Sequence, residues 1–392
     1  MPKDIVRNLG PSTSQSSTGE AIGHAEDYHS ILVNISPETT IFLSKFGEVK
    51  KATQLDWSWF TTGLRPPRKN KKKKKMEYTF EKLGSIEGKK NYQQYFYNSG
   101  YMTDAQKDSE NIFDQDDFSR EKMNAFIAHA QDIEYAIVKN TVSCGESGAQ
   151  LANTGGIPYF MQEDNVGCAV GVDGVVTTTA NHGLKTGEFV YFTAAAMPTN
   201  IAADCEYYVK VLTDKTFNIF DSIEGAVENI SSEQVVPTST GTDVKLVKNN
   251  VLDLGANDYT VEDLNRAMEM AFKRGGNPTD AFMSGRKKRR FSQLVTALGT
   301  TVRKSTEKKM TQVATAFESD YGTIVANTHR LYNDNRIDLL DMMYWDHKWF
   351  KRTSEPKNLA KTGSYDKFAI ESWYGLQATQ PKASASLINI KR

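Results

Sequence analysis

Two clusters of basic side chains are the residues of this sequence best suited to binding chemistry. The first is an uninterrupted run of lysines, and the second is a pentapeptide near residue 290. Ammonium and guanidinium groups gathered in one place bind carboxylates or phosphates through charge-assisted hydrogen bonds. The two clusters consist of Lys71, Lys72, Lys73, Lys74 and Lys75, and of Arg286, Lys287, Lys288, Arg289 and Arg290.

The two basic clusters differ in the roles that the sequence allows for them. The lysine run is either a solvated loop tip or a contact with the carboxylates or phosphates of a partner. The second cluster falls in the first turns of a predicted helix, where the helix dipole disfavours each cation by ~0.3–1 kcal/mol. Such a local conflict indicates an external partner. We prefer acidic side chains on a neighbouring subunit, with nucleic acid bound without sequence specificity as the alternative.

The sequence does not assemble a recognisable catalytic site. It has neither a phosphate-binding Gly-rich loop nor a dinucleotide fingerprint, and Gly145–Gly148 lacks the spacing of a nucleophile elbow. The six histidines are scattered, and His129 is better interpreted as a packed side chain than as a base. Acidic clusters at 114–117 and 253–258 are interpreted as caps and solvated turns rather than cation sites. We therefore expect no enzymatic activity, no metal and no cofactor.

Composition narrows the class of protein further. A length of 392 residues predicts two or three domains, and the 39% apolar and 24% charged content is typical of a soluble, folded chain. A net charge of zero argues against bulk electrostatic binding of nucleic acid. The unpaired Cys144, Cys168 and Cys205 predict a reducing compartment. We expect no membrane span and no signal segment.

A long helix is the element around which the others must be placed. Residues 118–140 contain no Pro or Gly and carry apolar residues at three- and four-residue spacing, which predicts one buried stripe. The opposite face, which includes Glu134, is expected to meet solvent or a neighbour. The predicted stripe consists of Met123, Phe126, Ile127, Ala130, Ile133 and Ile137.

Residues 50–103 are expected to form a long, two-stranded ribbon with the lysine run at its tip. Its first strand is rich in aromatic residues and ends at Pro66, and strand-like alternation resumes at 91–97. An isolated ribbon is only marginally stable, which predicts that it lies on another subunit. Its aromatic contact candidates are Trp57, Trp59, Tyr95 and Tyr97.

The second half of the chain predicts a β module followed by a domain that contains both helices and strands. Short Val-, Thr- and Gly-rich runs at 166–250 predict a small all-β sandwich or barrel. Thr260–Asp263 has the pattern of a capping box and opens a predicted helix. Later segments predict a strand at 280–284, a helix at 284–298, a hairpin at 311–330 and further strands to the end. We expect an α+β fold with mostly antiparallel pairing.

Several of these segments, taken in order, resemble one family of tailed-bacteriophage major capsid proteins. The segment ISPETTIFLSKFG, with Ser36, Pro37 and Phe42 in the family's positions, precedes the strand that bears Trp57. Further matches are DIEYAIVKN, DLNRAMEMAFKRGGNPTDAFMSGRKKRRFSQL, FESDYGTIVANTHRL, LLDMMYWDHKWFKR and EPKNLAKTGSYDKFAIESWYGL. The resemblance covers roughly residues 31–165 and 255–390.

The resemblance implies the Hong Kong-ninety-seven-type capsid fold. It also implies a division of the chain, with an all-β module where the family pattern has almost no intervening residues. The implied parts are an N-terminal arm at 1–35, an extended loop and its base at 36–105, a peripheral domain with the long helix at 106–165, an inserted β domain at 166–250, a peripheral helix at 251–276, an axial domain at 277–345 and C-terminal strands at 346–392.

The function that the resemblance implies is self-assembly into the icosahedral shell that encloses phage double-stranded DNA. The expected partners are copies of the chain in hexamers and pentamers, a separate scaffolding protein, a portal, and decoration or minor capsid proteins. Assembly is expected in the host cytoplasm and the final location is the virion. The alternatives are another phage structural protein, such as a tail tube or head–tail connector subunit, and a nucleic-acid-binding protein.

Overall fold

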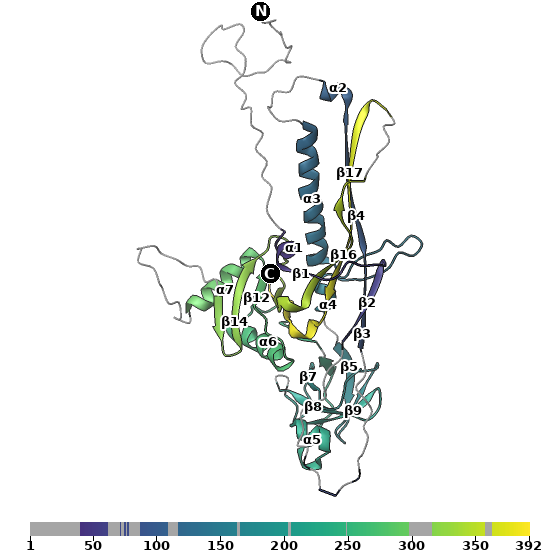
Figure 1. Cartoon of the computed structure of the whole chain (residues 1–392). Helices are drawn as coiled ribbons and strands as arrows, with labels where there is room; N and C mark the ends of the chain where they lie inside the picture. The colour runs from purple at the N-terminus through teal and green to yellow at the C-terminus, as the bar shows by residue number, and fades with distance from the viewer. Residues whose placement is uncertain are drawn as a thin grey trace, which may run out of the picture.

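The computed structural model describes most of the chain and gives the subunit an elongated shape (Figure 1). The described residues are 40–61, 71, 74–75, 77, 87–108, 117–162, 165–202, 205–247, 249–297, 316–356 and 363–392. The expected arm at 1–35 and the helix start at Ser36-Pro37 lie outside these ranges, as do Lys72 and Lys73. Among the described residues, no helix is both long and apolar enough to cross a membrane.

A long helix and a four-stranded sheet form one layered unit. Helix α3 spans Asp117–Lys139, as the sequence predicts for 118–140, and packs on strands β4 and β17 of the sheet. In Figure 1, α3 runs beside these two long strands over most of its length. The sheet has the order β1-β16-β17-β4, with β1 at Gly47–Glu48, β16 at Trp345–Ser354, β17 at Tyr365–Ala378 and β4 at Gln94–Thr103.

The expected ribbon is shorter than the sequence suggests. Strand β2 (Asp56–Thr61) pairs with β3 (Glu87–Tyr92) in a separate two-stranded sheet. Strand β4, which was expected to continue the ribbon, pairs instead with β17 along its whole length. Its alternating pattern meets a partner strand within the same chain, so only β2 and β3 make the described part of the ribbon.

A six-stranded sheet with two helices forms the second body. The capping box at Thr260 and Asp263 starts α6 (Val261–Lys273), and α7 spans Gly285–Ala297. Both helices share an apolar core with this sheet, so α6, which the resemblance grouped with the long helix, packs with α7. The strand order is β11 (Val251–Asp253), β18 (Ala385–Ile388), β15 (Ile337–Leu340), β12 (Asp280–Met283), β14 (Gly322–Thr328) and β13 (Ala316–Ser319).

A closed, wholly antiparallel barrel forms the third body. It has its own apolar core, and α5 (Ile223–Glu228) covers one end. The barrel is joined to α6 through Tyr191, Val247 and Met270, and Lys273 of α6 forms an ion pair with Glu206. Its strands, in barrel order, are β10 (Lys245–Val247), β5 (Asn165–Val170), β6 (Val175–Thr178), β9 (Thr216–Phe220), β8 (Tyr207–Val211) and β7 (Phe189–Thr193).

Two short helices lie near the centre of the molecule, and they join these bodies. Helix α1 (Ile41–Lys45) and helix α4 (Ile157–Phe160) both contact α3. Phe42 of α1 packs in the same apolar cluster as Phe282 of the six-stranded sheet and Trp345 of the four-stranded sheet. This central cluster is therefore the place where the long helix and both sheets meet. A further short helix, α2 (Asp104–Lys107), follows β4.

Candidate functional site

The lysine run belongs to the connection between the two ribbon strands. Strand β2 ends at Thr61 and β3 begins at Glu87, so residues 71–75 lie in the segment that joins them. Lys71, Lys74 and Lys75 are exposed, whereas Lys72 and Lys73 lie outside the described residues. Within the described part of the chain, no ion pair is formed by the three exposed lysines. Their ammonium groups are therefore open to a partner in the isolated subunit.

Trp57 and Trp59 attach the ribbon to the rest of the same subunit. Trp59 is 8% exposed, and its Nε1–H donates to the carbonyl of Ala378 at 3.1 Å. The Trp57 ring stacks on Trp59 with centroids 6.3 Å apart and lies directly over Gly375, where an added Cβ would fall 2.1 Å from the ring. These contacts fix the base of the ribbon on β17. The sequence predicted both tryptophans as contacts between subunits, but Trp59 contributes to the subunit's own core.

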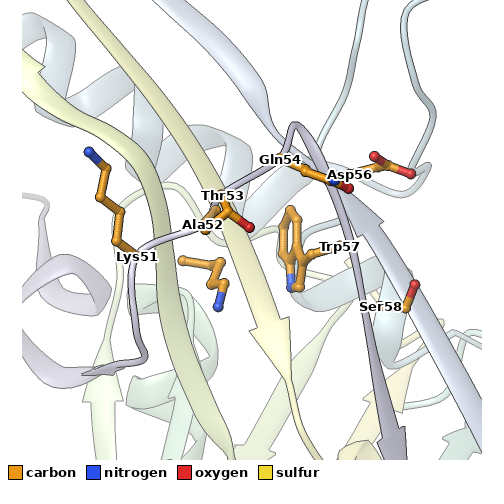
Figure 2. Close-up of a pocket in the computed structure, with 8 residues that line it drawn as sticks. Lys51, Ala52, Thr53, Gln54, Asp56, Trp57 and Ser58 are labelled. Carbon is orange, nitrogen blue, oxygen red and sulfur yellow. The ribbon is translucent and has the colours of Figure 1, made fainter.

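A small polar pocket opens beside this attachment (Figure 2). Its volume is about 240 Å³, and Lys51 and Lys348 contribute two cationic side chains to its lining. Asp56, the acidic residue of the lining, is engaged by Lys90 at 2.8 Å. The side-chain hydrogen bond from Lys90 lowers the pKa of the Asp56 carboxyl, with the Coulomb attraction of the same residue second. The pocket is a polar recess at the base of the ribbon.

Tyr95 and Tyr97 belong to an aromatic stripe on the open face of the four-stranded sheet. Side chains alternate along β4, so Phe96 faces α3 and its neighbours face away. Tyr97 is 56% exposed and Tyr101 is 73% exposed. Ring contacts join Tyr95 to Trp373 at 4.8 Å and Tyr101 to Tyr365 at 5.8 Å. We call this set, Tyr95, Tyr97, Tyr101, Tyr365 and Trp373, the outer aromatic stripe.

The sequence analysis missed three members of this stripe, although a signal for one of them was present. The period-two alternation of QYFYNSGYMT puts Tyr101 on the same face as Tyr95 and Tyr97. Trp373 and Tyr365 could not be placed without the strand register, which sets Trp373 opposite Tyr95. Burial raises the pKa of the Tyr95 hydroxyl, and its hydrogen bond to Glu371 raises it further.

An acidic groove lies on the other side of β4, against the N-terminal half of α3. Its volume is about 590 Å³. Its lining includes the carboxylates of Glu121 and Asp132, small residues such as Gly100, Ala125 and Ala128, and the larger Phe118 and Phe368, and the segment of β4 that carries Tyr97 and Tyr101 also contributes. Among the described residues that line the groove, none is basic. Asp132 accepts a hydrogen bond from the Asn98 amide at 3.2 Å, which orients that carboxylate at the groove.

The basic cluster on α7 divides into an exposed part and an internal part. Arg286 and Arg289 are exposed, whereas Lys287 is 3% exposed. The Lys287 ammonium donates to the carbonyl of Lys391 and lies 3.8 Å from Asp258, and burial lowers its pKa. Lys287 thus holds the C-terminal segment of its own subunit. The surface of the cluster that a partner can reach centres on Arg286 and Arg289.

A buried polar junction, absent from the sequence predictions, lies where α1 meets α3. Glu134 was expected on an outer face but is fully buried. Its carboxylate accepts from the amide of Phe42 at 2.7 Å, the amide of Leu43 at 3.1 Å and His329 Nε2–H at 2.9 Å. Because the His329 Nδ1 accepts from the Leu331 amide, the proton toward Glu134 resides on Nε2. Three donors compensate for the desolvation of this carboxylate.

The long helix carries a second departure from its expected pattern. Ile133 and Ile137 are buried as predicted, but Met123 is 62% exposed and Ile127 is 38% exposed. Phe126 and Ala130 are half-buried, so the described part of the chain covers this N-terminal half of the predicted stripe only in part and leaves Met123 the most exposed. His129, expected to be packed, is fully buried and bonds to Asn98 and Ser372.

Comparisons with known proteins give matches that cover almost the whole chain. Residues 11–391 match the family model of the SU10 major capsid protein. The capsid asymmetric unit of cyanophage A-1(L) superimposes with a TM-score of 0.54 at 10% sequence identity, covering 94% of this chain and 98% of that chain. The capsid of cyanophage P-SCSP1u superimposes with a TM-score of 0.51 at 8% sequence identity, covering 93% of this chain and 92% of that chain. At such low identity these two structures show a shared fold. No curated protein sequence matches the chain.

Proposed function

The chain belongs to the SU10 major capsid protein family, and from this premise we propose that it builds an icosahedral shell around the double-stranded DNA of a tailed phage. It is a capsid protein whose copies associate into a shell, and its fold is that of phage capsid subunits. The observation that carries the proposal is the family match over residues 11–391. The mechanism we infer is assembly rather than catalysis.

We propose that the ribbon tip of one subunit contacts the acidic groove of its neighbour. The exposed ammonium groups of Lys71, Lys74 and Lys75 carry the charge that complements Glu121 and Asp132. Small residues such as Gly100, Ala125 and Ala128 line part of the groove, beside larger ones such as Phe118 and Phe368, and its volume of about 590 Å³ can admit long lysine side chains. Because charge-assisted hydrogen bonds are roughly twice as strong as neutral ones, such a contact would fix the register between subunits.

The outer aromatic stripe is the second surface that we assign to contacts between subunits. Tyrosine and tryptophan provide large contact areas with little loss of conformational entropy, and they are enriched where proteins meet. Tyr97 and Tyr101 leave much of their surface in water in the isolated subunit.

For Arg286 and Arg289 we prefer acidic side chains of a neighbouring subunit as the binding partner, rather than DNA. The net charge of zero suits a shell that encloses DNA without binding it tightly.

The other partners that we propose follow from the family. They are a separate scaffolding protein, a portal, and decoration or minor capsid proteins, with assembly in the host cytoplasm before the subunit becomes part of the virion. The barrel at 165–247 is an independent closed sheet docked on α6. We infer that it is an insertion into the capsid fold that reinforces contacts between capsomers.

Electron microscopy of the purified protein, with and without a co-expressed scaffolding protein, tests the proposal. Closed shells tens of nanometres across are the expected result. Tubes or small rings would instead support a tail or connector subunit. Binding of duplex DNA by unassembled subunits should be weak at ~0.15 M salt, and tight binding with a steep salt dependence would support the nucleic-acid-binding alternative.

A further inference from the structure

We infer that the open stripe on the N-terminal half of α3 is the docking site for residues 31–35 of the same chain, so that the segment preceding α1 runs along the long helix. The open stripe consists of Met123 and Ile127, with the half-buried Ala130 below them. The inference concerns the folded subunit and does not depend on assembly into a shell.

The geometry of α3 places this stripe in line with the anchor of α1. Met123, Ile127, Ala130 and Glu134 are separated by four, three and four residues, so they lie on one face of the helix. At the lower end of this face, Glu134 binds the amides of Phe42 and Leu43, and α1 covers it. Figure 1 shows α1 beside the C-terminal half of α3, with the N-terminal half extending past it.

The length of chain before α1 matches the distance to the stripe. Glu134 and Met123 are eleven residues apart, which corresponds to about 17 Å along a helix. Ile41 follows Val33 by eight positions, which span up to about 26 Å in an extended chain. The chain that enters α1 can therefore reach both Ile127 and Met123 without moving α1 from its anchor.

The sequence of the preceding segment has the chemistry that the stripe requires. Residues 31–35 read Ile-Leu-Val-Asn-Ile, which is the first apolar run of the chain, whereas residues 11–20 are polar. An exposed methionine and isoleucine on a helix face gain by being covered with aliphatic side chains. The short β-branched run suits an extended segment laid along a helix. The occupant is thus a named piece of this chain rather than an unidentified protein.

Methionine oxidation by hydrogen peroxide, followed by mass spectrometry, tests the inference on dilute, unassembled full-length subunits. Met343 is 81% exposed and serves as the internal reference for Met123. If residues 31–35 cover Met123, it should oxidise about tenfold more slowly than Met343. Replacing Ile31, Leu32 and Val33 together by serine should bring its rate close to that of Met343. Replacing Ser14, Ser16 and Ser17 by alanine, in the polar run, is the matched control and should leave Met123 protected.

Three outcomes would overturn the inference. In the first, Met123 of the full-length chain oxidises as fast as Met343. In the second, it stays protected in the triple serine variant and in a chain lacking residues 1–35, whose fold is verified by circular dichroism. In the third, protection occurs only in assembled shells, which would identify a second copy as the occupant. The first two outcomes are measured on unassembled subunits and do not depend on whether shells form, so they are distinguishable from failure of the proposed function.

Discussion

Glu134 is the residue whose environment departs most from its sequence context. It lies fully buried on a helix, and its hydrogen-bond donors come from α1 and from His329 beyond β14. The carboxylate thereby joins the long helix to the chain segment before the ribbon and to the six-stranded sheet. A single side chain at this point connects three parts of the subunit.

Replacement of Glu134 by leucine should destabilise the subunit strongly. The variant leaves the amides of Phe42 and Leu43 and the Nε2–H of His329 without an acceptor, and each orphaned buried group costs about 1–3 kcal/mol. We expect the free energy of unfolding in urea to fall by about 3 kcal/mol or more. Glu121→Leu, on the exposed part of the same helix, is the control. Equal stability of the two variants would contradict the assigned role of Glu134.

The lysine side chains at the ribbon tip give a second prediction about individual residues. Replacing Lys71, Lys74 and Lys75 by glutamate should reduce shell yield at least tenfold in physiological salt, because like charges then meet Glu121 and Asp132 across the proposed contact. The circular dichroism of the subunit should not change. Adding Glu121→Lys on the same chain should restore part of the yield. If the combined variant assembles no better, the ribbon tip contacts another surface.

At the scale of the element, the base of the ribbon depends on one close approach of a ring to a strand. Gly375 lies near the C-terminal end of β17, opposite Lys348, and its missing side chain makes room for the Trp57 ring. Neighbouring contacts reinforce the attachment, since Asn91 of β3 donates to the carbonyl of Leu376 at 2.6 Å. The ribbon therefore leaves the subunit in a defined direction even though it consists of two strands.

Gly375→Ala tests this attachment. An added Cβ would lie 2.1 Å from the Trp57 ring, so the ring must move, and overpacking of this kind costs about 1–3 kcal/mol. We expect a lower melting temperature and a change in tryptophan fluorescence. Gly285→Ala is the control, because an added Cβ meets nothing within 4 Å there. Trp57→Ala combined with Gly375→Ala should be less destabilised than the sum of the single variants. Additive losses would mean that the ring does not approach Gly375.

At the scale of the whole molecule, a few polar groups are buried in the apolar interior, and two of them are histidines of the unit formed by α3 and the four-stranded sheet. His129 bonds to Asn98 and Ser372, and His347 bonds to the hydroxyl of Tyr374. Burial lowers the pKa of both imidazoles. Each is therefore neutral in the folded subunit over a range of pH in which the unfolded chain binds a proton.

The stability of the subunit should fall as the pH is lowered through about 6.5. A histidine with a lowered pKa in the folded state binds protons more readily when the chain unfolds, so acid favours unfolding by up to ~1.4 kcal/mol per pH unit for each histidine. Urea denaturation between pH 7.5 and 5 measures this slope. Replacing His129 and His347 by glutamine should flatten it. An unchanged slope would assign the pH dependence to other groups.

The sequence alone determined the elements and the family. Unbroken three- and four-residue spacing specified the long helix, the capping box at Thr260 specified α6, and dense β-branched residues specified an all-β module. These signals are local, because they depend on hydrogen bonds and side chains within a few residues of each other. The ordered segments around Trp57 and the later motifs were enough to indicate a capsid subunit.

Only the tertiary structure decided which of these residues are buried within the subunit and which stay exposed. It assigned β4 to the subunit's own sheet, buried Trp59, Lys287 and Glu134, and left Met123 exposed. Each of these depends on a residue far away in the sequence, such as Ala378 for Trp59 or His329 for Glu134. A period-two or period-3.6 pattern indicates that the two faces of a strand or helix differ in polarity. Which element covers each face depends on long-range packing.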